Sequence, residues 1–257
     1  MKNEQSKDIA IVGMAGRFPE ANTIVEFYEN LKNGKDSVKP LSEKRIKDTT
    51  LPTDLDYQIM GYLEDLDKFD HKFFNISMLE AQNMDPHQRQ LLEVVYELLE
   101  TSGYNVDEFN ESLTSVYVSA TDYQYQNFVD KFESTTFSGT THFSSAGRIA
   151  RAFNLRGPAS IADTGCSSAL VAVNLALNDL LLGNADYAIA AGIRLIMFPA
   201  LKKLYIDVGV TSKNGKTKSF SDDSHGSGSC EAVGAILLKP LEKAIADKDM
   251  IFGVIKS

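Results

Sequence analysis

Short apolar runs alternate along the chain with longer segments whose apolar residues recur at helical spacing. The runs predict strands at residues 9–14, 115–120, 159–163, 185–193 and 232–239. The segments between them predict helices at residues 23–34, 77–103 (interrupted at Pro86), 142–153, 167–182, 199–208 and 240–249. Because strands separated by helices are typical of parallel sheets, we expect an α/β fold with a mainly parallel sheet.

Three stretches fall outside this alternation. Residues 1–7 are expected to be a flexible start, and the charged residues 35–57 lack any period and predict a surface loop. Residues 250–257 have the pattern of a further strand, with no helix or polar tail after it. A strand left there would form an exposed apolar edge, so we expect either a fragment or a chain that another chain completes.

Composition excludes several classes of protein. The net charge of −9 over 257 residues leaves no basic surplus to neutralise phosphates, which argues against nucleic-acid binding. Two cysteines are too few for a disulfide scaffold and form no metal-ligand pattern. We find no signal peptide and no apolar run of membrane-spanning length, which predicts a cytoplasmic protein with free thiols.

The stretch "DTGCSSAL" places Cys166 between a predicted strand and a predicted helix. A side chain at a helix N-terminus lies among unpaired N–H groups, where the helix dipole favours a negative charge and hence a thiolate. Gly165 and two serines leave room for a sharp turn, and the N–H of Cys166 could face an oxyanion at an attacked thioester carbonyl. Cys166 is therefore either a nucleophile or a packed structural cysteine.

Other residues of this stretch have structural interpretations. Asp163 and Thr164 are expected to hold the turn by hydrogen bonds to the backbone. Ser167 and Ser168 are both expected to be helix-start residues rather than nucleophiles.

Several motifs in the same order resemble those of β-ketoacyl synthases, in particular the ketosynthase domains of modular polyketide synthases. "DTGCSSALVAVNLA" resembles their active-site segment, and "IAIVGMAGRFPEA" is similar to their opening strand. "DKFDHKFFNISMLEAQNMDPHQRQLLEVVYELLE" and "SSAGRIARAFNLRGPASIADTGCSSAL" resemble two further characteristic stretches. The resemblance extends from about Asp8 to the final residue.

The resemblance implies a thiolase-like fold in which two similar α/β halves form a layered αβαβα body, and a homodimer. This chain, residues 1–257, would be the N-terminal half. It implies no bound cofactor, because the acyl chain arrives on the phosphopantetheine arm of an acyl carrier protein. Cys166 would accept that chain, with Thr164, Gly165 and Ser167 forming the substrate and oxyanion environment. The resulting acyl-enzyme would be attacked by a carbanion from a decarboxylated malonyl-type extender.

The chain departs from this family in what it lacks. Two histidines normally carry the condensation, and both belong to the second half of the fold. The histidines present, His71, His87, His142 and His225, are expected to be polar loop or cap residues, with His225 the best placed for catalysis. Three hypotheses remain: a condensing enzyme completed by a second half, a binding or scaffold module, and a plain acyltransferase.

Residues outside the cysteine stretch also have structural or contact interpretations. Arg148 and Glu231 are expected to be structural residues near the site. In "CEAVG", Cys230 and Ala232 replace two glycines of related ketosynthases, and Cys230 is expected to be buried. Five aromatic residues fit either a dimer contact, an acyl tunnel or a loop core: Tyr123, Tyr125, Phe128, Phe132 and Phe137.

Overall fold

The computed structural model describes residues 8–49, 51–52, 54–120, 123–129, 131–199 and 203–256. The expected flexible start, residues 1–7, lies outside this range. The chain divides into two compact units. We call them the sheet unit (Met1–Gly16, Asp70–Ile193 and Val233–Ser257) and the loop unit (Arg17–Phe69 and Arg194–Ala232).

A six-stranded sheet with the order β5-β4-β6-β7-β1-β8 forms the centre of the sheet unit. Its strands are β1 (Ile9–Arg17), β4 (Thr114–Ala120), β5 (Ala159–Ala162), β6 (Tyr187–Arg194), β7 (Ala232–Pro240) and β8 (Gly253–Ile255). Strand β4 runs parallel to β5 and to β6, whereas β8 pairs antiparallel with β1. The predicted α/β class is thus confirmed, but the sheet is mixed.

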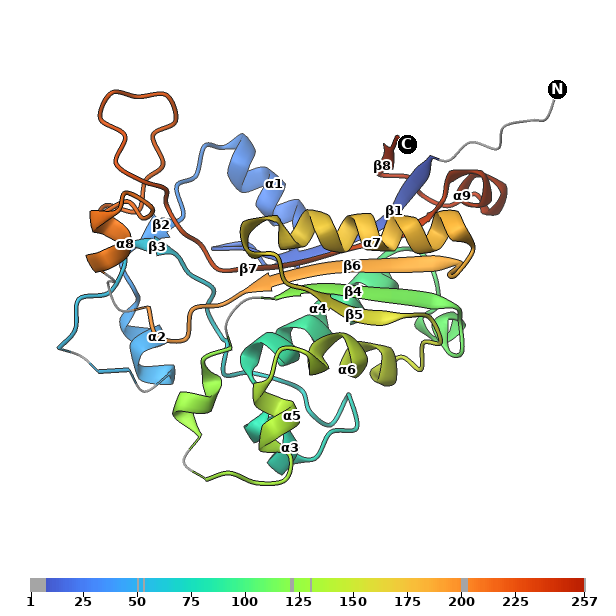
Figure 1. Ribbon diagram of the computed structural model, residues 1–257, viewed down its shortest axis with the longest axis horizontal. Coiled ribbons are helices and arrows are strands. Elements are labelled where there is room, and N and C mark those ends of the chain that lie inside the picture. Colours follow the sequence, from blue (N-terminus) through green and yellow to red (C-terminus); the bar gives the residue numbers. More distant parts are fainter. Residues whose placement is uncertain are drawn as a thin grey trace. The chain divides into compact units, whose positions relative to one another are not determined.

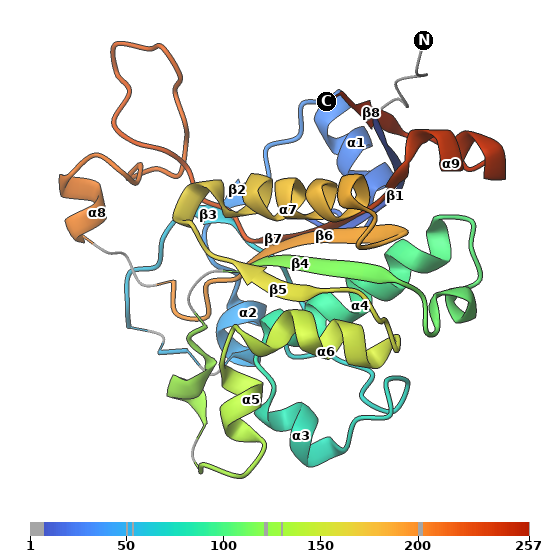
Figure 2. The same ribbon diagram turned by 45° about the vertical axis from the view of Figure 1, so that its right-hand side comes forward.

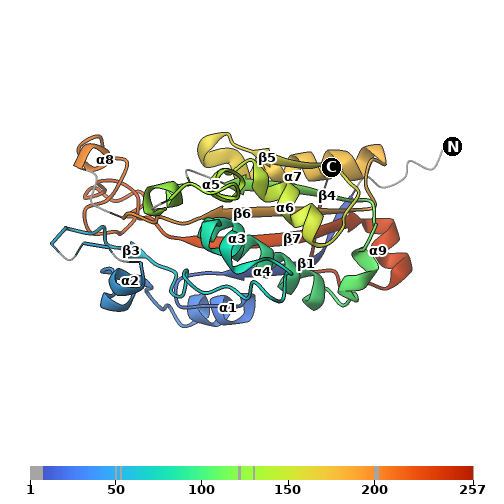
Figure 3. The same ribbon diagram turned by 90° about the horizontal axis from the view of Figure 1, so that it is seen from below.

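Helices cover both faces of this sheet (Figure 1). Helix α7 (Ser168–Leu182) lies along one face, and α4 (Pro86–Thr101) and α6 (Ser144–Ala152) lie on the other (Figures 2 and 3). Every residue of β4 is buried, because the strand has neighbours on both edges and helices on both faces. The sheet unit also contains α3 (Met78–Asn83), η1 (Val106–Phe109), η2 (Tyr125–Phe128), α5 (Thr136–Thr140), η3 (Gly165–Ser167) and α9 (Leu241–Asp247).

The long helical region predicted at residues 77–103 is two helices, as Pro86 indicated. Ser77 caps α3 by accepting a hydrogen bond from the N–H of Glu80. Asp85 caps α4 by accepting from the N–H of His87, and Pro86 occupies the first helical position, where no N–H is needed.

The loop unit contains two elements within residues 35–57, where the sequence pattern predicts only a surface loop. Its elements are α1 (Ile24–Lys32), β2 (Val38–Lys39), α2 (Glu43–Asp48), β3 (Met60–Gly61) and α8 (Lys203–Asp207). Helix α2 begins because Ser42 accepts a hydrogen bond from the N–H of Arg45, whose side chain is buried. The surface-loop interpretation was therefore wrong here, because six residues are too few to establish a helical period.

The helix predicted at residues 199–208 is also shorter than expected. Helix α8 ends at Asp207, and Pro199 lies outside it.

One segment also corrects the expectation about membrane-spanning length. Gly165–Leu182 has a mean hydropathy of 1.5 over its 18 residues and meets the length and composition of a membrane span, with 28% of it buried. In the sheet unit this segment packs on β4 and β5 and buries Ala172, Ala176 and Leu180 against the sheet. The apolar residues of this segment therefore include those on the face of α7 that packs against the sheet.

The start of β5 depends on a close backbone approach at Gly157. A Cβ at this position would lie 2.4 Å from the carbonyl carbon and oxygen of Thr114 and 2.6 Å from the nitrogen of Ser115. We expect Gly157→Ala to lower the free energy of unfolding by about 1–3 kcal/mol, because β5 must move away from β4. Gly147→Ala on α6 is the control, since no atom lies within 4 Å of its added Cβ.

The control substitution should raise stability by up to about 1 kcal/mol, because alanine is the better helix former. Urea unfolding of both variants measures the difference. Equal stabilities for the two variants would show that the approach at Gly157 does not constrain the sheet.

Candidate active site around Cys166

A tight turn presents Cys166 at the end of β5. Strand β5 ends at Ala162, Gly165–Ser167 form a 3-10 turn, and α7 starts at Ser168. Gly165 has a φ of +66°, a left-handed conformation that glycine adopts without a Cβ penalty. The thiol of Cys166 is free and exposed. The structure therefore places the cysteine in the turn that leads into a 15-residue helix, between the strand and the helix that the sequence predicts.

The two serines of the turn, Ser167 and Ser168, differ in their hydrogen bonds and in their exposure. The Oγ of Ser168 accepts from the N–H of Thr164 at 2.8 Å and donates to the carbonyl of Gly165 at 2.7 Å. The exposed Ser167 donates from Oγ to the carbonyl of Thr164 at 3.0 Å, and its side chain makes no helix-cap bond. Sequence reasoning treated the two serines alike, because burial cannot be inferred from two adjacent identical residues.

The remaining predicted turn residues lie where the sequence placed them. Asp163 accepts a long hydrogen bond, 3.4 Å, from the N–H of Gly165. The Oγ1 of Thr164 lies 2.9 Å from the Oγ of Ser167. Four residues of the turn are exposed: Asp163, Thr164, Gly165 and Ser167. Among the described residues, the turn is therefore open to a ligand.

A buried polar contact fixes the far end of α7. The hydroxyl of Tyr117 on β4 donates to Asp179 at 2.7 Å, and the side-chain amide of Asn184 donates to the same carboxylate at 3.3 Å. Burial, together with the Asp179 carboxylate, raises the pKa of Tyr117 to about 12. The phenol stays a donor at neutral pH, so the helix that carries Cys166 at its start is anchored to the sheet.

Arg148 does not share this side of the sheet. It lies on α6, across the sheet from α7 (Figures 1 and 2), and its guanidinium donates to Glu80 of α3 at 2.6 Å. This contact joins α3 and α6 on that face. The grouping of Arg148 with the cysteine as a nearby structural residue stays a prediction.

Glu231 is the centre of a buried network in the loop unit. Its Oε1 accepts from Nη2 of Arg45 at 3.1 Å and from the N–H of Ile196 at 2.8 Å. Its Oε2 accepts from Nη1 of Arg45 and from the N–H of Leu63, both at 2.9 Å. Glu231 is 0% exposed and Arg45 2%. The carboxylate thus joins three separate segments of the loop unit.

The neighbouring Cys230 is exposed rather than buried. Gly61 of β3 forms a parallel bridge with Cys230, which fixes the backbone and directs the next side chain, Glu231, inward. Successive side chains in extended chain point to opposite faces, so burying Glu231 exposes Cys230. The expectation of a buried Cys230 was wrong for this reason.

His87 and His71 make polar contacts within the fold, whereas His225 is exposed. His87 is fully buried, its Nδ1 lies 2.6 Å from Asp85, and its ring stacks on Tyr123 at 4.4 Å. Nδ1 of His71 contacts the carbonyl of Ile76 at 2.6 Å. His225 is exposed in the loop unit, 3.5 Å from Ser212.

The five aromatic residues left open by the sequence do not behave alike. Tyr123 is 8% exposed and belongs to the core, whereas Phe132 and Phe137 are 69% and 65% exposed. The exposed rings of Phe132 and Phe137 can therefore contact another molecule, whereas the buried ring of Tyr123 cannot.

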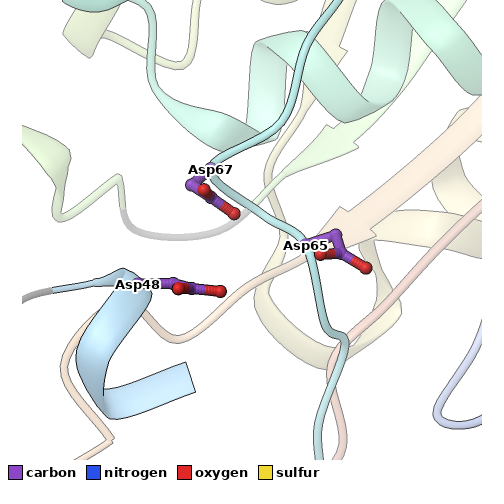
Figure 4. Close-up of side chains that lie close together, drawn as sticks. All are labelled: Asp48, Asp65 and Asp67. Carbon is purple, nitrogen blue, oxygen red and sulfur yellow. The ribbon is translucent and has the colours of Figure 1, made fainter. Parts of the chain in front are cut away.

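Three carboxylates gather in the loop unit, at the end of α2 and after β3 (Figure 4). The ligand atoms of Asp48, Asp65 and Asp67 lie within 4.8 Å of one another. Nζ of Lys44 donates to Asp65 at 2.7 Å and lies 3.1 Å from Asp48, and these hydrogen bonds raise the pKa of Lys44 above its usual range. A lysine ammonium thus balances this cluster, and we assign no metal to it.

Comparisons with known proteins identify the class to which this fold and turn belong. The family model "Beta-ketoacyl synthase, N-terminal domain" matches residues 6–244. Polyketide synthase PksM of Bacillus subtilis is 36% identical over 98% of this chain and 6% of that protein. Non-reducing polyketide synthase nvfA of Aspergillus novofumigatus is 38% identical over 97% of this chain and 11% of that protein.

The structural comparison agrees. The ketosynthase from module 6 of the Bacillus subtilis bacillaene synthase superposes with a TM-score of 0.84 and 34% identity, over 96% of this chain and 42% of that chain. The fold is therefore thiolase-like, the fold of condensing enzymes of the acyltransferase type. The chain belongs to the β-ketoacyl synthase family and matches its N-terminal domain. It spans less than half the length of the solved ketosynthase and about a tenth or less of the two synthases.

Proposed function

We propose that Cys166 accepts an acyl chain by thioester exchange and holds it for a decarboxylative condensation. The observation that carries the proposal is the exposed thiol in a hydrogen-bonded turn at the start of α7, in a chain of the β-ketoacyl synthase family. Exposure lets a substrate reach the sulfur, which acts as the nucleophile.

The acylation step follows from this position. The thiolate of Cys166 attacks the thioester carbonyl, a new carbon–sulfur bond forms, and the pantetheine sulfur leaves with the electron pair of the broken bond. The proton lost by Cys166 ends on that leaving thiol. The backbone N–H of Cys166 stabilises the oxyanion of the intermediate, and Thr164, Gly165 and Ser167 line the approach.

Condensation requires groups from a second half of the fold. The two family histidines would assist loss of carbon dioxide from the extender and stabilise the carbanion that attacks the acyl group. Exposed apolar side chains on the sheet unit support a covering layer. They are Leu170, Leu181 and Leu182 of α7, and Ile251, Phe252 and Val254 at the final strand.

The proposed partners are an acyl carrier protein, whose phosphopantetheine arm carries the acyl chain, this second half, and a second copy in a homodimer. The arm is a substrate carrier, so the chain needs no resident cofactor. We place the protein in the cytoplasm, where both thiols stay reduced. A scaffold module and a plain acyltransferase are the two other outcomes that the experiment below separates.

Intact-protein mass spectrometry after incubation with an acyl-pantetheine thioester tests the proposal. We expect wild type to gain one acyl group, Cys166→Ala to gain none, and Cys230→Ala, the control at the other exposed thiol, to match wild type. Each variant is measured with and without a separately expressed ketosynthase second half. No gain in either condition would leave a scaffold, and acylation without any condensation product in the completed protein would leave an acyltransferase.

A further inference from the structure

The side chain of Ser168 has an unusual place in the turn around Cys166. It is 2% exposed, although Asp163, Thr164, Cys166 and Ser167 around it are all exposed. Its single hydroxyl group accepts from the N–H of Thr164 and donates to the carbonyl of Gly165, at 2.8 and 2.7 Å. The buried hydroxyl therefore bonds two backbone groups that precede Cys166, the N–H of Thr164 and the carbonyl of Gly165.

These two backbone groups lie where the chain leaves regular structure. Strand β5 has ended at Ala162, so its ladder no longer provides partners for Thr164. The carbonyl of Gly165 follows a left-handed φ of +66° and also accepts the N–H of Ser168. The conformation of Gly165 sets where Cys166 points, and the Ser168 hydroxyl bonds the backbone of Thr164 and Gly165 to the first turn of α7.

We infer that Ser168 is the positioning residue that holds the sulfur and the backbone N–H of Cys166 in reacting geometry, an inference that rests on the proposed function. Thioester exchange needs both atoms at once, the sulfur as nucleophile and the N–H at the oxyanion. A displacement of about 1 Å in such a site costs about 100-fold in rate. Ser168 touches no substrate and acts through the turn.

Ser102 provides the control. It is the same residue type, it is 6% exposed, and its hydroxyl donates to the carbonyl of Leu99 at 2.6 Å. It ends α4, which lies across the sheet from α7 (Figure 2). Removing its hydroxyl therefore takes a hydrogen bond from a buried backbone carbonyl, as Ser168→Ala does, but on the other face of the sheet.

The test compares two reactions of Cys166 in wild type, Ser168→Ala and Ser102→Ala. Acylation by an acyl-pantetheine thioester needs the sulfur and the oxyanion donor, whereas alkylation by iodoacetamide needs only an accessible thiolate. We expect Ser168→Ala to reduce the maximal acylation rate about 10- to 100-fold with little change in half-saturating thioester and in alkylation rate. Ser102→Ala should stay within about threefold of wild type in both reactions.

A purely structural role would change both reactions alike, so equal losses in acylation and alkylation would overturn the inference. Wild-type acylation by Ser168→Ala would overturn it too, while leaving the proposed function intact. An unreactive wild type with the second half present would instead remove the proposed function. If Ser168→Ala does not fold, Ser168→Thr replaces it: the retained hydroxyl should keep the wild-type ratio of the two rates, and an altered ratio would overturn the inference.

Discussion

Changing Glu231 to glutamine is expected to lower the free energy of unfolding by about 3–5 kcal/mol, the loss typical of a buried ion pair that loses one partner. Each oxygen of the carboxylate accepts two hydrogen bonds, one from Arg45 and one from a backbone N–H. An amide nitrogen in either place would face two donors. The Arg45 cation, 2% exposed, would also lose its counter-charge.

The exposed pair of Glu111 and Arg156 is the control, with a comparable 2.7 Å contact and side chains 63% and 57% exposed. Glu111→Gln should cost less than about 1 kcal/mol, because water solvates both partners. Urea unfolding measures both variants. A double variant, Glu231→Met with Arg45→Met, should cost less than the sum of the two single changes, since neither then leaves a buried charge. Equal costs for Glu231→Gln and Glu111→Gln would contradict the structural importance of the network.

Lys239→Met is expected to have a similarly large effect in the sheet unit, about 3–5 kcal/mol. Lys239 is 2% exposed, and its ammonium donates to Asp249 at 2.7 Å, to the Tyr104 hydroxyl at 3.0 Å and to Asp247. Methionine would fill the space but leave Asp249, 8% exposed, without its cation. Because Asp247 is 57% exposed, Asp247→Asn should cost less than about 1 kcal/mol, whereas Asp249→Asn should approach the lysine variant.

The effect of this lysine should depend on pH in one direction. Burial opposes its charge, but the hydrogen bonds to Asp247, Asp249 and Tyr104 outweigh burial and raise the pKa of Lys239 above its usual range. A raised folded-state pKa stabilises the protein fully below the unfolded value of about 10.4, and this stabilisation is lost as the pH rises further. Unfolding at pH 7, 9 and 11 should show a constant difference between wild type and Lys239→Met up to pH 9, and a smaller one at pH 11. A difference that grows at pH 11 would refute this assignment.

Local pattern was sufficient for most elements of the sheet unit. The strand and helix on either side of Cys166 formed as expected, and Pro86 divided the helical region, because these signals act over a few neighbouring residues. The loop unit was harder to predict. Helix α2 is too short to show a period, and the burial of its Arg45 depends on Glu231, which lies 186 residues away in the sequence.

Periodicity and motif order are local properties of the chain, so the amino-acid sequence is sufficient to predict the α/β class, the family and a Cys166 that precedes a helix. The mixed sheet, the place of Arg148 across the sheet from α7 and the exposure of Cys230 follow only from the folded chain. The burial of Ser168 rather than Ser167 behind the cysteine also follows only from the fold. In each case, strand direction and burial depend on distant segments that meet only when the chain folds.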